Sequence, residues 1–279
     1  SKKFQDNIES ITTSQINSID DILKSKEEDL KKIWLIVGRL SNQKKSINHV
    51  AVIMDGNGRW ALKNKVSKKK GHETGIKNCI QICKSLRKLD YNIREISFYV
   101  FSTENWKRSP YEINNLFSLI EEFYENFSNT ADDNNLVIRH YGSKDNLSRR
   151  IKKIIDLVTE RTKLNSGTFI NLMFNYGSRK EINDAFAKMI KNKKRTKNIR
   201  DYLYTKNSYD PDLIIRTGGE QRLSNFMLWQ SAYSELYFTK TLWPDFKLRH
   251  LNYILHAYSQ RARKLGKWKN CLIKNYLRG

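Results

Sequence analysis

The sequence predicts an α/β fold, with a mostly parallel six-stranded sheet covered by helices on both faces and an extra N-terminal helix. The first observation is an unbroken apolar run at residues 50–54, which is typical of a strand buried on both faces of a parallel sheet. The second is that strand-like segments alternate with amphipathic segments along almost the whole chain. The third is that polar clusters follow four of these strands, at the edge where such sheets collect ligands.

The predicted strands are runs of mainly apolar residues at 50–54, 96–101, 136–141, 168–174, 212–215 and 235–238. Helices are predicted near Arg59, at 76–86, 110–127 and 147–162, after Arg179, and at 225–232 and 250–265. The helix at 110–127 has the clearest start, because Ser109 and Glu112 have capping-box spacing and Pro110 occupies the first helical position. Its apolar stripe either packs in the core or lines an apolar channel, and the sequence leaves both open. The basic run at 191–200 is predicted to be a solvated loop.

Length and composition suit one large domain with an appended segment. The chain has 279 residues, which is enough to bury a core without covalent staples. Apolar residues recur at roughly helical spacing near the N-terminus, so we predict an amphipathic helical extension at residues 1–48 and a catalytic domain at 49–279. The extension either docks on the body or rests on a membrane surface.

The chain is strongly basic, with 52 Lys and Arg against 29 Asp and Glu and a net charge of +23. Such an excess attracts nucleic acid, anionic lipid or phosphorylated substrates. Cys79, Cys83 and Cys271 fit no disulfide framework or zinc site, so we expect reduced thiols. No 18-residue apolar run and no signal peptide are visible.

Residues 49–60 form the most informative stretch. An apolar strand runs into Asp55, then into two glycines around an asparagine, and then into Arg59. Glycine and asparagine accept left-handed backbone angles at low cost, so free N–H groups and an arginine can form a phosphate cradle here. A tight Asp-Gly turn without a ligand explains this stretch equally well.

Four polar clusters, at residues 55–59, 102–108, 175–179 and 216–224, are expected to meet at the carboxyl edge of the sheet. Their arginines suit phosphate oxygens, and their number suggests more than one phosphate group. A single carboxylate, Asp55, in such a cradle is what Mg²⁺ requires. His72 follows a glycine near the cradle and either holds a phosphate or caps its helix.

Three blocks of the sequence, at residues 49–60, 101–108 and 215–226, resemble the signature blocks of the cis-prenyltransferases, which include undecaprenyl and dehydrodolichyl diphosphate synthases. Leu228-Trp-Gln, Glu235-Leu-Tyr-Phe and the segment 242–246 extend the resemblance to roughly residues 48–266. The resemblance implies sequential condensation of isopentenyl diphosphate onto an allylic diphosphate such as farnesyl diphosphate, with each new double bond in the Z configuration. The implied product is a long-chain polyprenyl diphosphate for a dolichol-type carrier lipid. The all-helical trans-prenyltransferases carry Asp-Asp-x-x-Asp motifs, and none occurs here.

The resemblance also implies roles for individual residues. Asp55 would bind Mg²⁺ together with Glu235, and Asn105 is the proposed proton acceptor. The residues implied to bind the allylic diphosphate or line its site are Gly56, Asn57, Gly58, Arg59, Trp60, Lys68, His72, Trp106 and Arg108. Those implied at the reaction centre are Ser102, Thr103 and Glu104, and those implied for isopentenyl diphosphate are Arg216, Arg222, Leu223 and Ser224.

Three positions depart from the family pattern. Lys68 and Lys264 stand where the family usually has arginine, which keeps the charge and loses the fork geometry, and Gln221 replaces a histidine. Because Glu235 is retained, we predict a homodimer that is active without a second kind of subunit. We expect a cytoplasmic protein with peripheral contact at the endoplasmic reticulum membrane. The competing hypothesis is a non-catalytic basic scaffold or partner subunit that binds anionic lipid or nucleic acid.

Overall fold

The computed structural model describes residues 25–26, 28–29, 44–191 and 198–261. The chain divides into two compact units, residues 1–45 and 46–279. Nearly all of the predicted N-terminal helical extension lies outside the described residues, as do Lys264 and Cys271 and part of the basic run. Within the described residues, no helix combines the length and apolarity that crossing a membrane requires.

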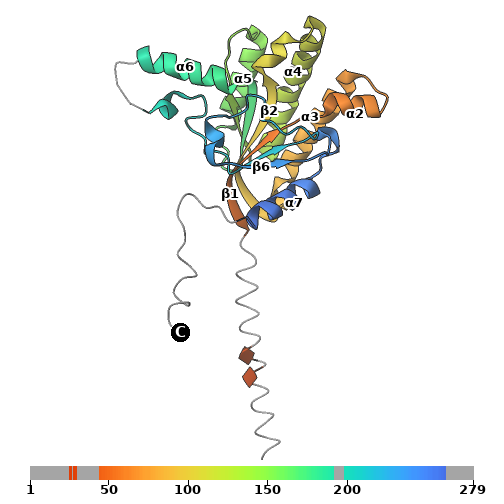
Figure 1. Ribbon diagram of the computed structural model, residues 1–279, viewed down its shortest axis with the longest axis vertical. Helices are drawn as coiled ribbons and strands as arrows, with labels where there is room; N and C mark the ends of the chain where they lie inside the picture. Colours follow the sequence, from red (N-terminus) through yellow and green to blue (C-terminus); the bar gives the residue numbers. More distant parts are fainter. Residues whose placement is uncertain (1–24, 27, 30–43, 192–197, 262–279) are drawn as a thin grey trace, which may run out of the picture. The chain divides into compact units, whose positions relative to one another are not determined.

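The sheet has six strands, as the sequence predicts (Figure 1). The strands are β1 (Lys45–Ile53), β2 (Tyr91–Ser102), β3 (Val137–Tyr141), β4 (Phe169–Tyr176), β5 (Leu213–Arg216) and β6 (Glu235–Phe238), and their order is β3-β4-β2-β1-β5-β6. The pairs β1/β5, β2/β4, β3/β4 and β5/β6 are parallel. The register places Ile53 beside Arg216, so the carboxyl ends of β1 and β5 meet at one edge.

Layers of apolar side chains cover both faces of the sheet. Alternate residues of β1 point to opposite faces, with Val50 and Val52 in the larger core and Ala51 and Ile53 in the smaller one. The larger core receives side chains from α3 (Lys68–Ser85), α4 (Pro110–Asp133), α5 (Arg149–Thr162) and α7 (Leu248–Ser259). The smaller core is closed by residues of the segment 204–227, beside α6 (Ser178–Lys191). The predicted mostly parallel six-stranded sheet with helices on both faces is confirmed, whereas the predicted N-terminal helix lies almost entirely outside the described residues.

Several element boundaries differ from the predictions. The predicted helix at 225–232 is wrong: this segment forms turns and the short 3₁₀ helix η4 (Gln230–Tyr233). Asn225 and Met227 have φ angles of +64° and +46°, which an α-helix does not allow. Helix α7 ends at Ser259, and the part of the predicted helix beyond residue 261 lies outside the described residues. Strand β1 begins five residues before the predicted run, and β1 ends at Ile53, so Met54 leaves the strand and lines a pocket.

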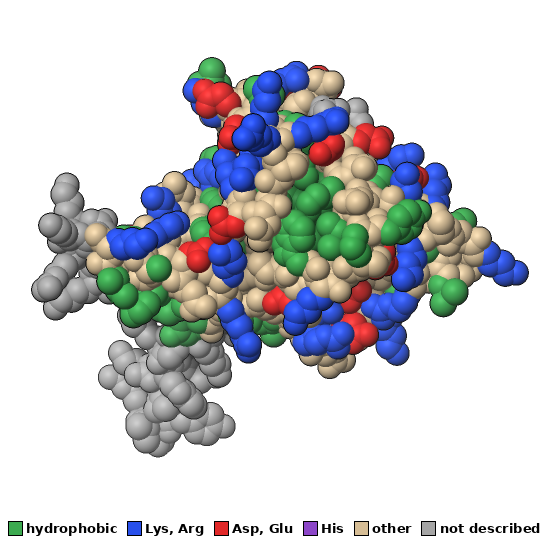
Figure 2. Space-filling view, turned by 90° about the horizontal axis from the view of Figure 1, so that it is seen from above, with side chains coloured by type: hydrophobic (Ala, Val, Ile, Leu, Met, Phe, Trp, Pro, Cys, Tyr) green, Lys and Arg blue, Asp and Glu red, His purple; other side chains and the backbone are tan. Residues whose placement is uncertain are grey.

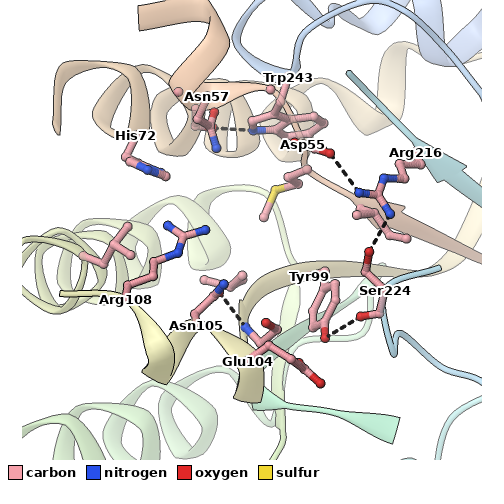
Figure 3. Close-up of a pocket in the computed structure, with 18 of the residues that line it drawn as sticks. Asp55, Asn57, His72, Tyr99, Glu104, Asn105, Arg108, Arg216, Ser224 and Trp243 are labelled. Carbon is pink, nitrogen blue, oxygen red and sulfur yellow. Dashed lines mark hydrogen bonds and ion pairs between the residues drawn. The ribbon is translucent and has the colours of Figure 1, made fainter. Parts of the chain in front are cut away.

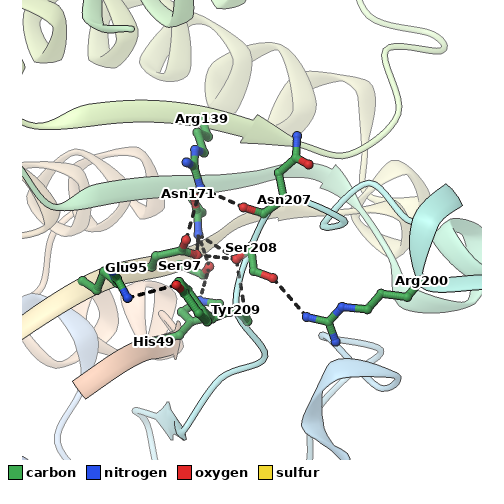
Figure 4. Close-up of polar contacts among 10 residues, drawn as sticks. His49, Glu95, Ser97, Arg139, Asn171, Arg200, Asn207, Ser208 and Tyr209 are labelled. Carbon is green, nitrogen blue, oxygen red and sulfur yellow. Dashed lines mark hydrogen bonds and ion pairs between the residues drawn. The ribbon is translucent and has the colours of Figure 1, made fainter. Parts of the chain in front are cut away.

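A buried polar network crosses the sheet on the side of the smaller core (Figure 4). Its centre is Glu95 of β2, which is 1% exposed and forms an ion pair with Arg139 at 3.2 Å. Glu95 also accepts hydrogen bonds from Asn171, at 3.2 Å, and from the Ser208 hydroxyl. The network therefore ties β2, β3 and β4 to the segment that precedes β5.

His49 extends this network on β1. Its Nδ1 lies 2.6 Å from the Tyr209 carbonyl oxygen and its Nε2 lies 2.7 Å from the Ser97 hydroxyl. Because a carbonyl oxygen only accepts, Nδ1 carries the proton and Nε2 accepts from Ser97. Burial lowers the pKa of His49, so the ring is neutral. His49 thus also binds the segment that precedes β5, and it does so from β1, which flanks β2 on the side opposite to β4.

Candidate active site

A cavity of about 1060 Å³ opens at the carboxyl ends of β1, β2 and β5 (Figure 3). One end of the cavity is polar and is lined by residues of the four predicted clusters, and the other end is apolar. Figure 2 views the molecule from above and shows hydrophobic side chains in the middle of that face, with many Lys and Arg side chains around them. The structure therefore brings the predicted clusters together at one edge, as the parallel strands require.

Asp55 lies at the centre of the polar end, directly after β1 and Met54. Its Oδ1 pairs with Arg59 at 3.1 Å, and its Oδ2 pairs with Arg216 at 2.9 Å. Arg216 is the last residue of β5 and is 4% exposed. One carboxylate therefore holds two guanidinium groups that the sequence assigned to different substrates.

Two glycines allow the backbone to close around Asp55. Gly56, at the N-cap of α2 (Asn57–Lys63), has a φ of +113°, and Gly218 has a φ of +85°. A Cβ atom on Gly218 would lie 2.7 Å from the Arg59 guanidinium. The Gly218 carbonyl instead accepts a hydrogen bond from Arg59 at 2.6 Å. Asn57 and Gly58, in the first turn of α2, line the cavity, and the first N–H groups of a helix have no partner within the helix.

A basic group lies between α3 and the start of α4, formed by Lys68 and His72 of α3 and by Arg108, which follows η2 (Figure 3). Lys68 forms an ion pair with Glu112 at 3.3 Å. Burial, together with the nearby Arg108 guanidinium, lowers the pKa of His72 to about 4. His72 is therefore neutral at neutral pH and can donate a hydrogen bond without adding charge.

The stability of the protein should depend on the protonation of His72. Between the ordinary pKa of 6.5 and about 4, the unfolded chain binds a proton at His72 and the folded chain does not. We therefore expect the free energy of unfolding to fall as the pH falls through this window. The variant His72→Asn should lose less stability over the window than the parent, as measured by urea unfolding at about pH 7 and about pH 5. Burial also lowers the pKa of His140 to about 4, but this residue contributes the same loss of stability in the parent and in the variant. Equal losses would contradict the prediction.

The loop after β2 forms the short 3₁₀ helix η2 (Thr103–Lys107), which carries predicted reaction-centre residues. The amide oxygen of Asn105 accepts from the Ser102 N–H at 3.0 Å, which fixes the side chain in a capping box. Glu104 accepts a hydrogen bond from Asn225 at 2.7 Å. Asn105 lines the cavity, and an amide oxygen has two lone pairs, of which the Ser102 N–H occupies one.

The loop after β5 presents the third predicted group. Arg216 donates to the Ser224 hydroxyl at 2.7 Å and also to the Arg222 carbonyl. Ser224, Asn225 and Met227 all have positive φ angles, which are uncommon for residues other than glycine. This loop stores backbone strain while it aims Ser224 at the Arg216 guanidinium.

The apolar end of the cavity lies between α3 and α4. It is lined by Ile76, Cys79, Val100, Leu116, Ile120 and Phe123. Phe123 stacks on Phe127 of the next helical turn, with ring centroids 4.9 Å apart. The sequence left open whether the apolar stripe of α4 packs in the core or lines a channel. The structure shows both, because the first part of the stripe lines the cavity and its later part packs in the core.

Most of the predicted site residues line the cavity. They are Asp55, Gly56, Asn57, Gly58, Lys68, His72, Ser102, Glu104, Asn105, Arg108, Arg216, Leu223 and Ser224. The predicted residues that do not line it are Arg59, Trp60, Thr103, Trp106, Arg222 and Glu235. Of these, Arg59 still contacts Asp55.

The two predicted tryptophans act behind the cavity in this structure. Trp60 donates its indole N–H to Asp245 at 2.8 Å. Trp106 donates to Asn175 at 2.8 Å and packs edge-on against Phe117 of α4, with centroids 5.3 Å apart. Trp106 therefore supports the helix that lines the apolar end.

Glu235 lies far from Asp55 along the strand direction. Glu235 is the first residue of β6 and pairs in register with Leu213, the first residue of β5. Asp55 lies at the other end of the sheet, because it comes two residues after Ile53, which pairs with Arg216, the last residue of β5. The Glu235 carboxylate pairs with Arg261 at 2.6 Å. A single chain thus does not bring the two predicted metal ligands together.

The cavity is also lined by residues that the sequence analysis does not assign to the site, among them Tyr99, Glu112, Arg179, Asn225 and Trp243. Arg179 and Asn225 were visible in or beside the predicted clusters. Tyr99 was hidden in the β2 apolar run: it stacks on Phe226 at 4.4 Å, and its hydroxyl donates to the Ser224 carbonyl at 3.3 Å. Burial raises the pKa of Tyr99, so its hydroxyl stays protonated.

The polar end suits a hard divalent cation that a substrate brings with it. Among the described residues, there is no group of three or more His, Cys, Asp or Glu side chains that could hold a metal by themselves. Asp55 does supply one carboxylate among arginines, and Mg²⁺ is commonly held by one or two carboxylates together with substrate phosphates. The residues present therefore fit Mg²⁺ that is bound jointly with a diphosphate.

The geometry of the cavity defines a class of site. A cavity that is rich in arginine at one end and apolar at the other binds a molecule with an anionic head and an apolar tail. The family model described as "Putative undecaprenyl diphosphate synthase" matches residues 53–266. The chain belongs to this family, and it is a cis-prenyltransferase.

Individual relatives agree with this assignment. The chain is 42% identical over 228 residues to an isoprenyl transferase of Leptospira interrogans, which covers 78% of this chain and 94% of the relative. It is 39% identical over 257 residues to an isoprenyl transferase of Clostridium perfringens, which covers 89% and 98%.

Two solved structures have the same fold. Lavandulyl diphosphate synthase from Lavandula x intermedia, in complex with dimethylallyl diphosphate, has a TM-score of 0.74 and 30% identity, and covers 79% of this chain and 98% of its own. A probable undecaprenyl diphosphate synthase from Campylobacter jejuni has a TM-score of 0.64 and 32% identity, and covers 79% and 99%.

Proposed function

We propose that this prenyltransferase adds isopentenyl diphosphate repeatedly to an allylic diphosphate, with farnesyl diphosphate as the primer, in the presence of Mg²⁺. The product is a long-chain polyprenyl diphosphate with new double bonds in the Z configuration. The observation that carries the proposal is that Asp55 and Arg216, which pair with each other, line the same cavity as the apolar side chains of α3 and α4. A growing apolar chain can extend between α3 and α4 while its diphosphate stays among the arginines.

Each cycle needs one C–O bond to break and one C–C bond to form. The allylic C1–oxygen bond breaks as the diphosphate leaves, and the isopentenyl double bond attacks C1. A proton is then lost from the isopentenyl unit to form the new double bond. Arg59, Arg108 and the N–H groups at the start of α2 would stabilise the charge that builds on the departing diphosphate. Arg216 and Ser224 would hold isopentenyl diphosphate on the opposite side, and the fixed amide oxygen of Asn105 would accept the proton.

Mg²⁺, when bound, would supply Lewis-acid stabilisation of the leaving diphosphate. Asp55 is the residue of this chain that would hold it. Glu235 would join the metal only through a rearrangement or from a second copy of the chain, because it lies at the other end of β6.

We also propose that the active species is a homodimer that needs no second kind of subunit. Activity that emerges only after a different subunit is added would refute this. The dolichol-type role of the product, the cytoplasmic location and the peripheral contact with the endoplasmic reticulum membrane stay predictions from the sequence.

The test is incubation of the purified protein with farnesyl diphosphate, labelled isopentenyl diphosphate and Mg²⁺, followed by sizing of the extracted products. We expect chain growth that stops when Mg²⁺ is removed with EDTA. A non-catalytic basic scaffold would instead give no chain growth, together with metal-independent polyanion binding that weakens steeply with salt.

The proposed grip on isopentenyl diphosphate can be tested with Arg216→Lys. Lysine keeps the charge, but its ammonium group cannot hold Asp55, Ser224 and a phosphate in one planar fork. Loss of a charged hydrogen bond costs about 2–3 kcal/mol, so kcat/KM for isopentenyl diphosphate should fall roughly 100-fold. Steady-state kinetics with varied isopentenyl diphosphate measure this. The matched control is Arg161→Lys, which alters an arginine that pairs with Asp132 away from the cavity. A parental kcat/KM in Arg216→Lys would contradict the assignment.

A further inference from the structure

Five charged side chains of alternating sign form a continuous row that starts at the polar end of the cavity, with Arg216 and Asp55, and continues beside it. Arg216 pairs with Asp55 at 2.9 Å, and Asp55 pairs with Arg59 at 3.1 Å. Arg59 also lies 3.5 Å from Glu220, and Glu220 pairs with Arg222 at 2.5 Å. Each of these three arginines is therefore bound to a carboxylate of the protein itself.

Glu220 occupies a special place in this row because it joins arginines of the two proposed diphosphate sites. Arg59 belongs to the proposed allylic site and Arg222 to the proposed isopentenyl site. Glu220 follows Gly218 and Gly219, which both have φ angles of +85°. These two glycines turn the loop so that the Gly218 carbonyl and the Glu220 carboxylate both contact Arg59.

Glu220 accepts a hydrogen bond from Nη1 of Arg222 and lies within ion-pair distance of Nη1 of Arg59. A guanidinium has five N–H donors, so a diphosphate that takes this same edge of Arg59 or of Arg222 displaces the Glu220 carboxylate. The negative charge of either ligand also repels this carboxylate. Once the first ligand has moved Glu220 aside, the second ligand no longer has to do so.

We propose that Glu220 couples the two diphosphate sites, so that each substrate binds more tightly when the other is already present. This inference rests on the proposed function, because it assigns Arg59 and Arg222 to different substrates. Glu220 is a positioning residue here, since it acts on the substrates through the two arginines. Coupling between two sites is reciprocal, so each ligand must strengthen the other by the same factor.

The expected coupling is modest. The Glu220 side chain is 36% exposed, and its partners Arg59 and Arg222 are 46% and 62% exposed. Exposed ion pairs contribute little free energy, so we expect a coupling factor of about two- to five-fold. Such a factor lies within the range of isothermal titration calorimetry.

The experiment titrates isopentenyl diphosphate into the full chain, with and without the unreactive analogue farnesyl thiodiphosphate, in Mg²⁺ buffer. In the parent we expect the analogue to lower the Kd of isopentenyl diphosphate about two- to five-fold. In Glu220→Gln we expect each ligand alone to bind more tightly than in the parent and the coupling to vanish. Glu160→Gln is the matched control, because Glu160 is a 70% exposed residue of α5 that pairs with Lys163. This control should keep the parental coupling.

Retention of the parental coupling in Glu220→Gln would overturn the inference, as would weaker binding of each ligand alone. If Glu220→Gln fails to fold, as judged by circular dichroism, Glu220→Asp replaces it. Its shorter side chain cannot reach both arginines, so its coupling should also be lost. Chain growth by the parent is measured on the same preparation. Absence of chain growth by the parent refutes the proposed function. Chain growth by the parent together with parental coupling in Glu220→Gln refutes only the role of Glu220.

Discussion

Replacing Asp55 by Ala is expected to lower the rate of chain growth on the order of 1000-fold while leaving the protein folded. Two effects combine in this variant. The proposed Mg²⁺ loses the carboxylate that would hold it at the leaving diphosphate. Arg59 and Arg216 also lose the group that fixes both guanidinium planes, at 3.1 Å and 2.9 Å. The departing charge would then meet donors that are no longer preorganised.

The loss should appear in kcat more than in the KM of either substrate. Without Asp55, both arginines are free to bind ground-state diphosphates, so substrate affinity is kept or increased. A substitution that lowers kcat and spares KM removes an interaction that is made in the transition state. Steady-state kinetics with farnesyl diphosphate and labelled isopentenyl diphosphate separate the two parameters.

A matched control tests whether loss of a carboxylate in itself matters. Asp156→Ala removes a 63% exposed carboxylate of α5 that pairs with Lys144, and it should retain parental kinetics. Asp55→Asn keeps the shape and loses the charge, so it should resemble Asp55→Ala. Near-parental kcat in Asp55→Ala would remove Asp55 from the catalytic role.

Replacing Glu95 by Ala should have the largest effect on stability, a loss of about 3 kcal/mol in the free energy of unfolding. Glu95 is 1% exposed and joins Arg139, Asn171 and Ser208. Its removal deprives Arg139 of its carboxylate, and Asn171 and Ser208 each lose one of their acceptors. The Arg139 side chain is 26% exposed and can be partly hydrated, which places the cost at the lower end of the range for broken buried pairs.

Urea unfolding followed by circular dichroism measures the Glu95 effect, with Glu160→Ala as the surface control. The control should stay within about 0.5 kcal/mol of the parent, because its carboxylate is solvated. The variant Glu95→Gln keeps the shape and should fall between Glu95→Ala and the parent. A stability of Glu95→Ala equal to that of the control would show that the network carries no net stability.

Local patterns were sufficient to predict the elements of this fold. Strand β6 was predicted with the correct bounds, and the start of α4 was predicted from Ser109, Pro110 and Glu112. The segment 225–232 failed because its apolar content indicates helix, whereas its positive φ angles are imposed by the loop that aims Ser224 at Arg216.

The sequence alone determined that polar clusters follow four strands, and that Asp55 stands at the head of the first cluster. These features depend on periodicity and on neighbouring residues, so they can be read along the chain. Only the tertiary structure decided which residues meet, because that depends on pairings between distant segments. Asp55 and Arg216 are 161 positions apart, and parallel pairing of β1 with β5 brings them within 2.9 Å. The register of β5 with β6 places Glu235 beside Leu213, at the end of the sheet away from Arg216, although the Glu235 motif follows the Arg216 motif closely in the sequence.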